Sequence, residues 1–514
     1  MSLRRATAPL FASLLAAAAI LSGCGGGGGS NVDVGPAVAV PANAALYMDA
    51  TVRPTGTAEA GAKAAATKIF NTSDPGGKIV SLIEQQSKSS GHPISYQQDV
   101  APWLGHEAAV FFTSFGADTN GSFVIETTNP QAALATAQKA SGATATNPAP
   151  QSYNGSSYQR SPADPTTVFG TVGNFLVEGS EAGFRAAVDA NKGLSLGDSG
   201  DFKDAVGNLP DDRLGTFYTV PKTLIAALPA GQFGTSQQAL LQKTAGDQLD
   251  KPVSGALTAS ADNIDLEFVG GSNGVETPES SLIGSVPSQS WLALGIADLG
   301  KGLQNTINQL KDSGVPGIEQ GLAQIQAATG ASIDQLAAAL GDAVLYVQGT
   351  KQKKLSGALV IHTNDPSLTG RLLGQLQSLV QLGVQGVKPL TLSGGGTGFQ
   401  INDPSVAPAP IEIAQQGDKL VVGYGAGSVA QSVAPTQDLT SSATFSAAKG
   451  QVSSLGTDFF LSFPAVFQLA ENGGAKKDPG YRQVKPYLDA LNYLVSGSGT
   501  KGDQTELKAV VGLK

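Results

Sequence analysis

The segment whose residue types most resemble a catalytic motif is Gly197-Asp198-Ser199-Gly200, which resembles the nucleophile loop of chymotrypsin-like proteases. A nucleophilic serine of this kind needs a histidine base and an orienting acid. The protease pattern also has a further glycine where this chain has Asp201. A second segment, Thr440-Ser441-Ser442-Ala443, likewise precedes a helical pattern that carries a phenylalanine. Since serine and threonine are favoured helix N-caps, we predict helix starts at both places and no nucleophile.

A glycine-rich loop, Gly423-Tyr424-Gly425-Ala426-Gly427-Ser428, lies between a predicted strand and a predicted helix, where phosphate-binding loops are found. It lacks the last glycine of a dinucleotide fingerprint and the Gly-Lys pair of a nucleotide loop. The corresponding segment of the first half, Gly179 to Gly183, carries Glu181, whose charge would repel phosphate. We interpret the loop as a tight turn with a helix cap.

The three histidines, His92, His106 and His362, have no second histidine at a ligand spacing, and the chain has a single cysteine. Zinc and copper sites normally use these residue types. The acidic run from Asp198 to Asp204 lacks the ligand alternation of an EF-hand. The sequence therefore predicts no metal site and no cofactor.

Carboxylates are the remaining route to chemistry. Asp211-Asp212 and Asp458 lie near the starts of two equivalent predicted strands. Paired carboxylates can hydrolyse glycosidic bonds when a cleft holds them on either side of the substrate. A polar strand edge explains the same residues, so a carboxylate-dependent envelope hydrolase is kept as the alternative function.

The N-terminus indicates export. Arg4 and Arg5 precede an apolar run that is too short for a transmembrane helix but typical of a secretory signal. The run ends in Leu21-Ser22-Gly23-Cys24, a bacterial lipobox, and five glycines follow. We predict a signal peptide at 1–23, lipid attachment at Cys24 and a flexible tether at 24–37. The protein would then be anchored by acyl chains such as palmitate on the extracytoplasmic face of the cell membrane.

Composition limits the partners. The chain of 514 residues has a formal net charge of −9 and no cluster of lysine and arginine. Nucleic acid is therefore excluded as a partner, because phosphates need positive charge to bind. A hydrophobic content of 41% is enough for substantial cores, and a lone acylated cysteine leaves no disulfide.

The two halves of the chain repeat one another. Ile125-Glu126-Thr127-Thr128-Asn129-Pro130 matches Ile361-His362-Thr363-Asn364-Asp365-Pro366, with Asn129 or Asp365 placed to cap a helix. Further matches follow in the same order: the segments that begin at Trp103 and Ala339, the hairpin turns at Gly173-Asn174 and Gly417-Asp418, and the segments that begin at Phe217 and Phe460.

These matches predict an α+β fold of two tandem copies, each a mainly antiparallel sheet with helices packed on one face. Copy 1 is expected at 38–274, a linker at 275–285 and copy 2 at 286–514.

The sequence also resembles the bacterial family known as domain of unknown function 3352. The residues that carry the resemblance are Val40-Pro41 with Leu46-Tyr47-Met48-Asp49, Asp99-Val100-Ala101-Pro102-Trp103-Leu104-Gly105, and Phe202 through Leu209-Pro210 to Phe217-Tyr218. The second copy lacks the Pro-Trp pair and the Leu-Pro-Asp-Asp step. The family has no assigned reaction, so the resemblance implies architecture and export and leaves the activity open.

Taken together, the sequence predicts a non-catalytic envelope lipoprotein, of unknown molecular function, with a binding or structural role. Its expected partners are the membrane, through the N-terminal lipid, and an envelope protein, glycan or lipid ligand. A deep polar pocket that joins two buried carboxylates would favour the hydrolase instead.

Overall fold

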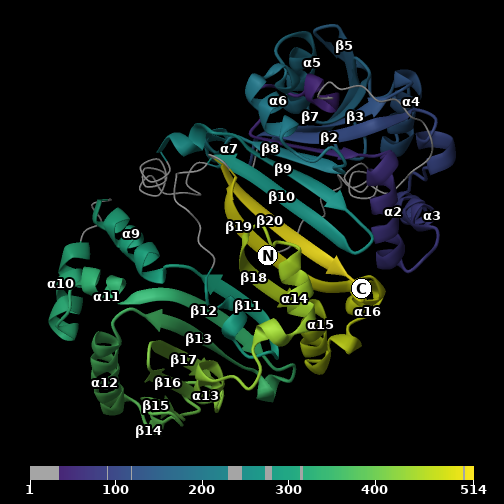
Figure 1. Ribbon diagram of the computed structural model, residues 1–514. Helices are drawn as coiled ribbons and strands as arrows, with labels where there is room; N and C mark the ends of the chain where they lie inside the picture. Colours follow the sequence, from purple (N-terminus) through teal and green to yellow (C-terminus); the bar gives the residue numbers. More distant parts are fainter. Residues whose placement is uncertain are drawn as a thin grey trace. The chain divides into compact units, whose positions relative to one another are not determined.

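The computed structural model describes residues 34–89, 91–116, 119–229, 246–271, 280–312, 317–501 and 504–514. The predicted signal peptide 1–23, Cys24 with its predicted lipid attachment, and the glycine tract lie outside these residues. The chain forms two compact units, the first from the described residues up to 271 and the second from residue 280 onward. Helices and antiparallel strands occur in both, which confirms the α+β class (Figure 1).

In the first unit, the strands are β1 (Leu46–Thr51), β2 (Leu104–Ser114), β3 (Asn120–Thr127), β4 (Gln151–Tyr153), β5 (Ser156–Arg160), β6 (Thr167–Val172), β7 (Phe175–Ser180), β8 (Gly215–Thr219), β9 (Val253–Ala259) and β10 (Asn263–Gly271). Their order across the sheet is β10-β9-β8-β1-β2-β3-β7-β6-β5-β4, and each of these pairs is antiparallel. The helical segments are η1 (Gly35–Ala39), α2 (Gly56–Phe70), α3 (Pro75–Ser89), η2 (Tyr96–Val100), α4 (Pro130–Ser141), α5 (Glu181–Lys192), η3 (Leu196–Asp198), α6 (Gly200–Gly207), α7 (Pro221–Ala227) and η4 (Gly246–Asp250).

In the second unit, the strands are β11 (Ser290–Ile296), β12 (Leu340–Gln348), β13 (Ser356–Thr363), β14 (Val387–Thr391), β15 (Thr397–Ile401), β16 (Ile411–Gln416), β17 (Lys419–Tyr424), β18 (Gly456–Ser462), β19 (Leu491–Lys501) and β20 (Gln504–Leu513). Their order is β20-β19-β18-β11-β12-β13-β17-β16-β15-β14. The helical segments are η5 (Ile283–Ser285), α9 (Leu299–Asp312), α10 (Ile318–Thr329), α11 (Ile333–Ala338), η6 (Gln352–Lys354), α12 (Pro366–Gly383), α13 (Ser428–Val433), η7 (Leu439–Ser441), α14 (Ala443–Gly450), α15 (Phe463–Asn472), η8 (Ala475–Lys477) and α16 (Pro479–Leu488).

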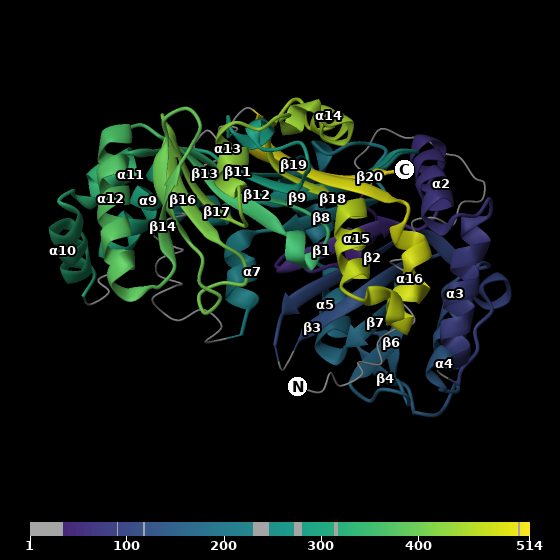
Figure 2. The ribbon, with the colours of Figure 1, turned by 90° about the horizontal axis from the view of Figure 1, so that it is seen from below.

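Helices cover both faces of each sheet, so the prediction of helices on one face is wrong. In β7, Val177 packs with Phe184 of α5, whereas the adjacent Leu176 packs with Ala133 of α4. Successive strand residues point to opposite faces, so α4 and α5 lie on opposite sides of the first sheet. In the second unit, α12 covers β15 and β16 on the face opposite to α14 (Figure 2).

Local chemistry fixes the helix starts as the sequence predicts. The Asn129 side chain accepts a hydrogen bond from the Ala132 N–H, and Asp365 accepts one from the Leu368 N–H. The hairpin turns at Gly173 and Gly417 have φ angles of 56° and 58°, which glycine adopts without strain.

Both folded units begin earlier in the chain than the sequence predicts. Gly35–Ala39 form η1 and bury Ala37, so the last three residues of the predicted tether 24–37 belong to the folded part. Within the predicted linker 275–285, Ile283 is buried in η5. Both segments supply apolar side chains to a core, which a flexible connection does not do.

Candidate functional site

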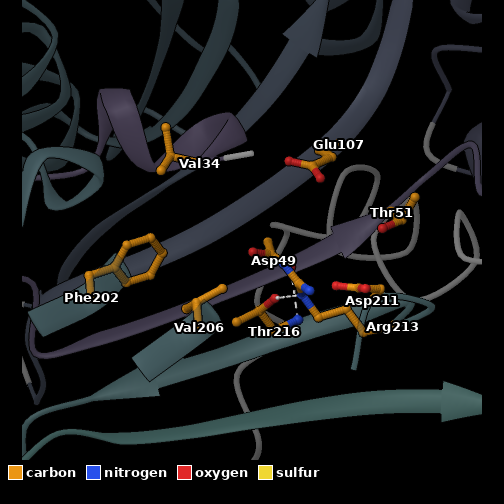
Figure 3. Close-up of a pocket in the computed structure, with 9 residues that line it drawn as sticks. All are labelled: Val34, Asp49, Thr51, Glu107, Phe202, Val206, Asp211, Arg213 and Thr216. Atoms are coloured by element: carbon orange, nitrogen blue, oxygen red, sulfur yellow. Dashed lines mark hydrogen bonds between the residues drawn. The ribbon is translucent and has the colours of Figure 1, made fainter. Parts of the chain in front are cut away.

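A cavity of about 160 Å³ lies in the first unit. It is lined by polar residues from the three strands β1, β2 and β8 and from one loop, and by apolar residues from α6 and from the start of the described chain (Figure 3). The lining residues are Val34, Asp49, Thr51, Glu107, Phe202, Val206, Asp211, Arg213 and Thr216. The cavity therefore combines three carboxylates and one guanidinium with an apolar wall.

Strand β1 places the central carboxylate. It runs between β2 and β8, where Asp49 pairs with Ala109 on one side and Thr216 on the other. Asp49 is two residues from Tyr47, so the two side chains point to the same face of the sheet. Tyr47 is 1% exposed and packs edge-on against Phe202 of α6. Asp49 consequently points toward the core side of the sheet and into the cavity.

Asp49 is held by hydrogen bonds on both oxygens. Its Oδ1 accepts the backbone N–H of Thr216 at 2.8 Å, and its Oδ2 accepts the Tyr47 hydroxyl at 3.0 Å. Burial raises the pKa of Asp49, while these two partners and the charge of Arg213 oppose that rise. Burial, followed by the negative charge of Asp49, raises the pKa of Tyr47 well above its ordinary value. Tyr47 therefore stays protonated and acts as a hydrogen-bond donor to the carboxylate.

Arg213 is fixed beside Asp49 by the loop that leads into β8. Its Nε donates to Thr216 Oγ1 at 3.2 Å, and its Nη1 donates to the Pro210 carbonyl at 3.0 Å. A guanidinium has five N–H groups, so within the described part of the chain three of them form no hydrogen bond. These donors are available to a bound molecule.

Glu107 lies against the backbone at Gly35, near the start of the described residues. A Cβ atom at Gly35 would lie 1.7 Å from Glu107 Oε2, and Gly35 has a φ of +39°. Only glycine fits that approach, because it has no side chain and tolerates positive φ. The backbone that enters the folded body thus forms one edge of the cavity, next to Val34.

The predicted carboxylate pair is only partly at this site. Asp211 lines the cavity, whereas its exposed neighbour Asp212 does not. Asp458, in β18 of the second unit, accepts a hydrogen bond from the Ser498 hydroxyl at 2.5 Å.

The two serines predicted to lie at helix starts are caps. Ser199 accepts the Phe202 N–H at the start of α6, and Ser442 accepts the Phe445 N–H at the start of α14. No histidine lines the cavity. The Nδ1 atom of His362 instead lies 3.2 Å from Oδ2 of Asp418.

The backbone N–H groups at the glycine-rich loop Gly423–Ser428 already bind a side-chain carboxyl group of the protein, that of Glu412. Glu412, 4% exposed, accepts the backbone N–H groups of Gly427 and Val429 at 2.8 and 3.1 Å. A phosphate would have to displace this carboxylate, so the interpretation as a turn and cap is confirmed.

Among the described residues, no group of three or more His, Cys, Asp or Glu side chains could hold a metal ion. The helices in the same residues include none with the length and apolar character needed to span a membrane.

Sequence reasoning missed Asp49, Glu107, Arg213 and Thr216. Asp49, Glu107 and the segment from Arg213 to Thr216 are far apart in the chain and meet only because β1 pairs with both β2 and β8. One signal was present in Leu46-Tyr47-Met48-Asp49: the charged residue occupies the same strand face as the aromatic Tyr47. A charge on the buried face of a strand requires a partner or a ligand.

A family model described as a protein of unknown function (DUF3352) matches residues 8–503. No curated protein matches the chain significantly. Two solved structures, crystal forms I and III of TP0453, share 10% and 11% identity with it. The alignments cover 78% of this chain and 97% or 99% of the other, with TM-scores of 0.16 and 0.18. TM-scores this low support no conclusion about fold or function.

Proposed function

Because the chain belongs to the DUF3352 family, whose description names no activity, we propose a function from the site itself: this is a tethered binding protein of the cell envelope. Its Cys24 carries the lipid anchor, and its first unit binds a small polar molecule without reacting with it. The observation that carries the proposal is the cavity, in which Asp49 and Arg213 are fixed in place and donors remain available.

We further infer that the two units are tandem copies of one domain. The order of strands in the second unit is that of the first with every number raised by ten. The register supports the same conclusion, since Ile125 pairs with Leu176 and Ile361 pairs with Leu420. The bridge Pro41–Ser195 likewise has a counterpart in Pro287–Asp438.

Strand register adjusts one of the sequence matches. Tyr47 of β1 pairs with Tyr218, and in the second unit Ala293 of β11 pairs with Phe460. Tyr218 and Phe460 are both buried. Phe460 therefore corresponds to Tyr218, one residue beyond the Phe217 that the sequence match chose.

The copies differ where the cavity lies. Asp49 pairs with Ala109, and at the corresponding place Gly295 pairs with Val344. A Cβ at Gly295 would lie 2.9 Å from the Ser280 side chain, so the incoming chain of the second unit occupies that space. Under the duplication, the second copy has lost the central carboxylate, and binding is assigned to the first copy alone.

A carboxylate-dependent hydrolase is the second candidate, and one observation favours it: Asp49, with its raised pKa, and Glu107 line the same cavity. The size of the cavity opposes it, because sites for drug-sized or polymeric substrates usually enclose about 300–1,000 Å³. Asp49 is also held by Tyr47 and Thr216. Release of sugar or amine from envelope polymers by the native protein, lost in Asp49→Asn, would establish the hydrolase.

Blocking the cavity tests the binding function. Thr51 lines it from the end of β1, so Thr51→Phe is expected to fill it and to abolish binding of small polar compounds in calorimetric titrations. Thr113→Phe, on β2 and outside the lining, is the matched control and should bind as the native protein does. If Thr51→Phe affects no binder, the cavity is not a binding site.

Anchoring is tested separately by Cys24→Ser. Loss of the acylated thiol is expected to move the protein from the membrane fraction to the soluble fraction, because no other anchor is proposed. An unchanged membrane fraction for this variant would show that the lipid is not the sole anchor.

A further inference from the structure

Building on the proposed binding function, we propose that the cavity of the first unit recognises a compact zwitterion. The ligand class is a primary ammonium joined by a few carbons to a carboxylate or phosphate. Free amino acids and phosphoethanolamine belong to this class, as does the headgroup of phosphatidylethanolamine.

The ammonium group of the ligand is inferred from the charge of the residues that line the cavity. Three carboxylates, from Asp49, Glu107 and Asp211, face one guanidinium, from Arg213. Such an excess of negative charge attracts a cation into a confined, partly buried space. An ammonium also suits the acceptors, because its three N–H donors can be shared among several carboxylate oxygens.

The anionic group of the ligand is inferred from the N–H donors of Arg213. Its Nε–H and one Nη1–H are taken by Thr216 and Pro210, which orient the guanidinium and leave its other N–H groups for a ligand. Guanidinium groups pair with carboxylates and phosphates through two parallel hydrogen bonds. A simple cation would leave these donors unused and would be repelled by Arg213, so a cation alone fits the cavity less well.

The size and the apolar wall limit the spacer. An enclosed space of about 150 Å³ holds a benzene molecule, so a cavity of about 160 Å³ suits a ligand of roughly six to ten non-hydrogen atoms. Phe202 and Val206, both buried, can pack against a short methylene chain. Nucleotides and oligosaccharides are too large for this space.

Calorimetric titration of the full-length protein tests the assignment. The probes are glycine, γ-aminobutyrate and phosphoethanolamine as zwitterions, with ethanolamine, acetate and inorganic phosphate as singly functional controls. At least one zwitterion is expected to bind, and at least tenfold more tightly than either of its halves. Asp49→Asn and Arg213→Gln should each weaken that zwitterion at least tenfold, while Asp212→Asn, outside the lining, should not.

Vesicles separate the two sources of this chemistry. Vesicles of phosphatidylethanolamine that compete with the bound zwitterion, when phosphatidylcholine vesicles do not, would identify a lipid headgroup. A zwitterion that binds without competition from either vesicle would identify a free solute. Both results support the proposed ligand class.

Four results would overturn it. If ethanolamine or phosphate alone binds as tightly as the zwitterions, or if Arg213→Gln changes nothing, the zwitterion assignment is wrong. If no zwitterion binds, but another compound does and Thr51→Phe abolishes its binding, the assignment fails while the proposed binding function stands. If Thr51→Phe affects no compound, both fail.

Discussion

Glu178 is expected to make the first unit less stable as pH rises. It lies in β7, across from Phe123 of β3 and Phe169 of β6. Burial, with a smaller contribution from the negative charge of Asp164, raises the pKa of Glu178 from 4.5 to about 7. The folded protein therefore holds a proton that the unfolded chain releases at lower pH.

The direction and size of the effect follow from proton linkage. Below the unfolded pKa of 4.5, Glu178 is protonated in both states and its full stabilisation is present. From there to the folded pKa of about 7, the free energy of unfolding falls by about 1.4 kcal/mol per pH unit. Above pH 7 the loss levels off at roughly 3 kcal/mol. Glu178→Gln, which resembles the protonated acid, should match the native protein near pH 4 and exceed its stability by roughly 3 kcal/mol at pH 8.5.

The two tryptophans of the chain make the measurement specific to the first unit. Trp103 is buried in the same core as Phe169, and Trp291 lies in β11 of the second unit. In a Trp291→Phe background, fluorescence during urea unfolding reports the first unit. Glu178→Val, which introduces the residue found at position 422 of the second unit, should also remove the pH dependence. Parallel pH profiles for the native and Glu178→Gln proteins would refute the argument.

The other predictions concern caps, close backbone approach and the second core. Ser199→Ala and Ser442→Ala should each cost about 1 kcal/mol in urea unfolding, and unequal roles for the two serines would contradict a shared capping function. Gly61→Ala should cost about 1–3 kcal/mol, because its Cβ would lie 1.9 Å from a backbone oxygen of β9. Gly321→Ala, with nothing within 4 Å in the interior of α10, should instead gain about 0.5–1 kcal/mol in thermal unfolding. Phe445→Ala should destabilise the second unit by about 3–5 kcal/mol, since Phe445 is 0% exposed and packs edge-on against Phe460; a loss below 1 kcal/mol would contradict this packing.

The sequence predicted those parts of the fold that depend on local chemistry. The caps at Asn129 and Asp365 need only a side-chain acceptor before a helix, and the turns at Gly173 and Gly417 need only a positive φ. Such requirements act within a few residues, so the sequence pattern contains them in full.

The placement of helices on both faces was missed although a signal existed. The pairs Val124-Ile125 and Leu176-Val177 are apolar at consecutive positions, and all four residues are buried. A strand with one solvated face alternates apolar and polar residues, whereas a run such as this indicates burial on both faces. The many hairpins correctly indicate an antiparallel sheet, but an antiparallel sheet can have one or both faces covered, so they do not determine where the helices pack.

The cavity was missed for a different reason, which bears on where function would lie under the duplication that we propose. The positions that the two halves of the sequence share are glycines, prolines and apolar residues, which serve turns and cores. Under the proposed duplication Asp49 corresponds to Gly295, so it is not among the shared positions. Its partners are also remote, because Arg213 reaches it only through the pairing of β1 with β8. If duplication gave both copies one fold, the residues that distinguish them are the ones free to acquire a role. Asp49 is then informative because only one copy has it, on the buried face of a strand, where an isolated charge is costly without a partner.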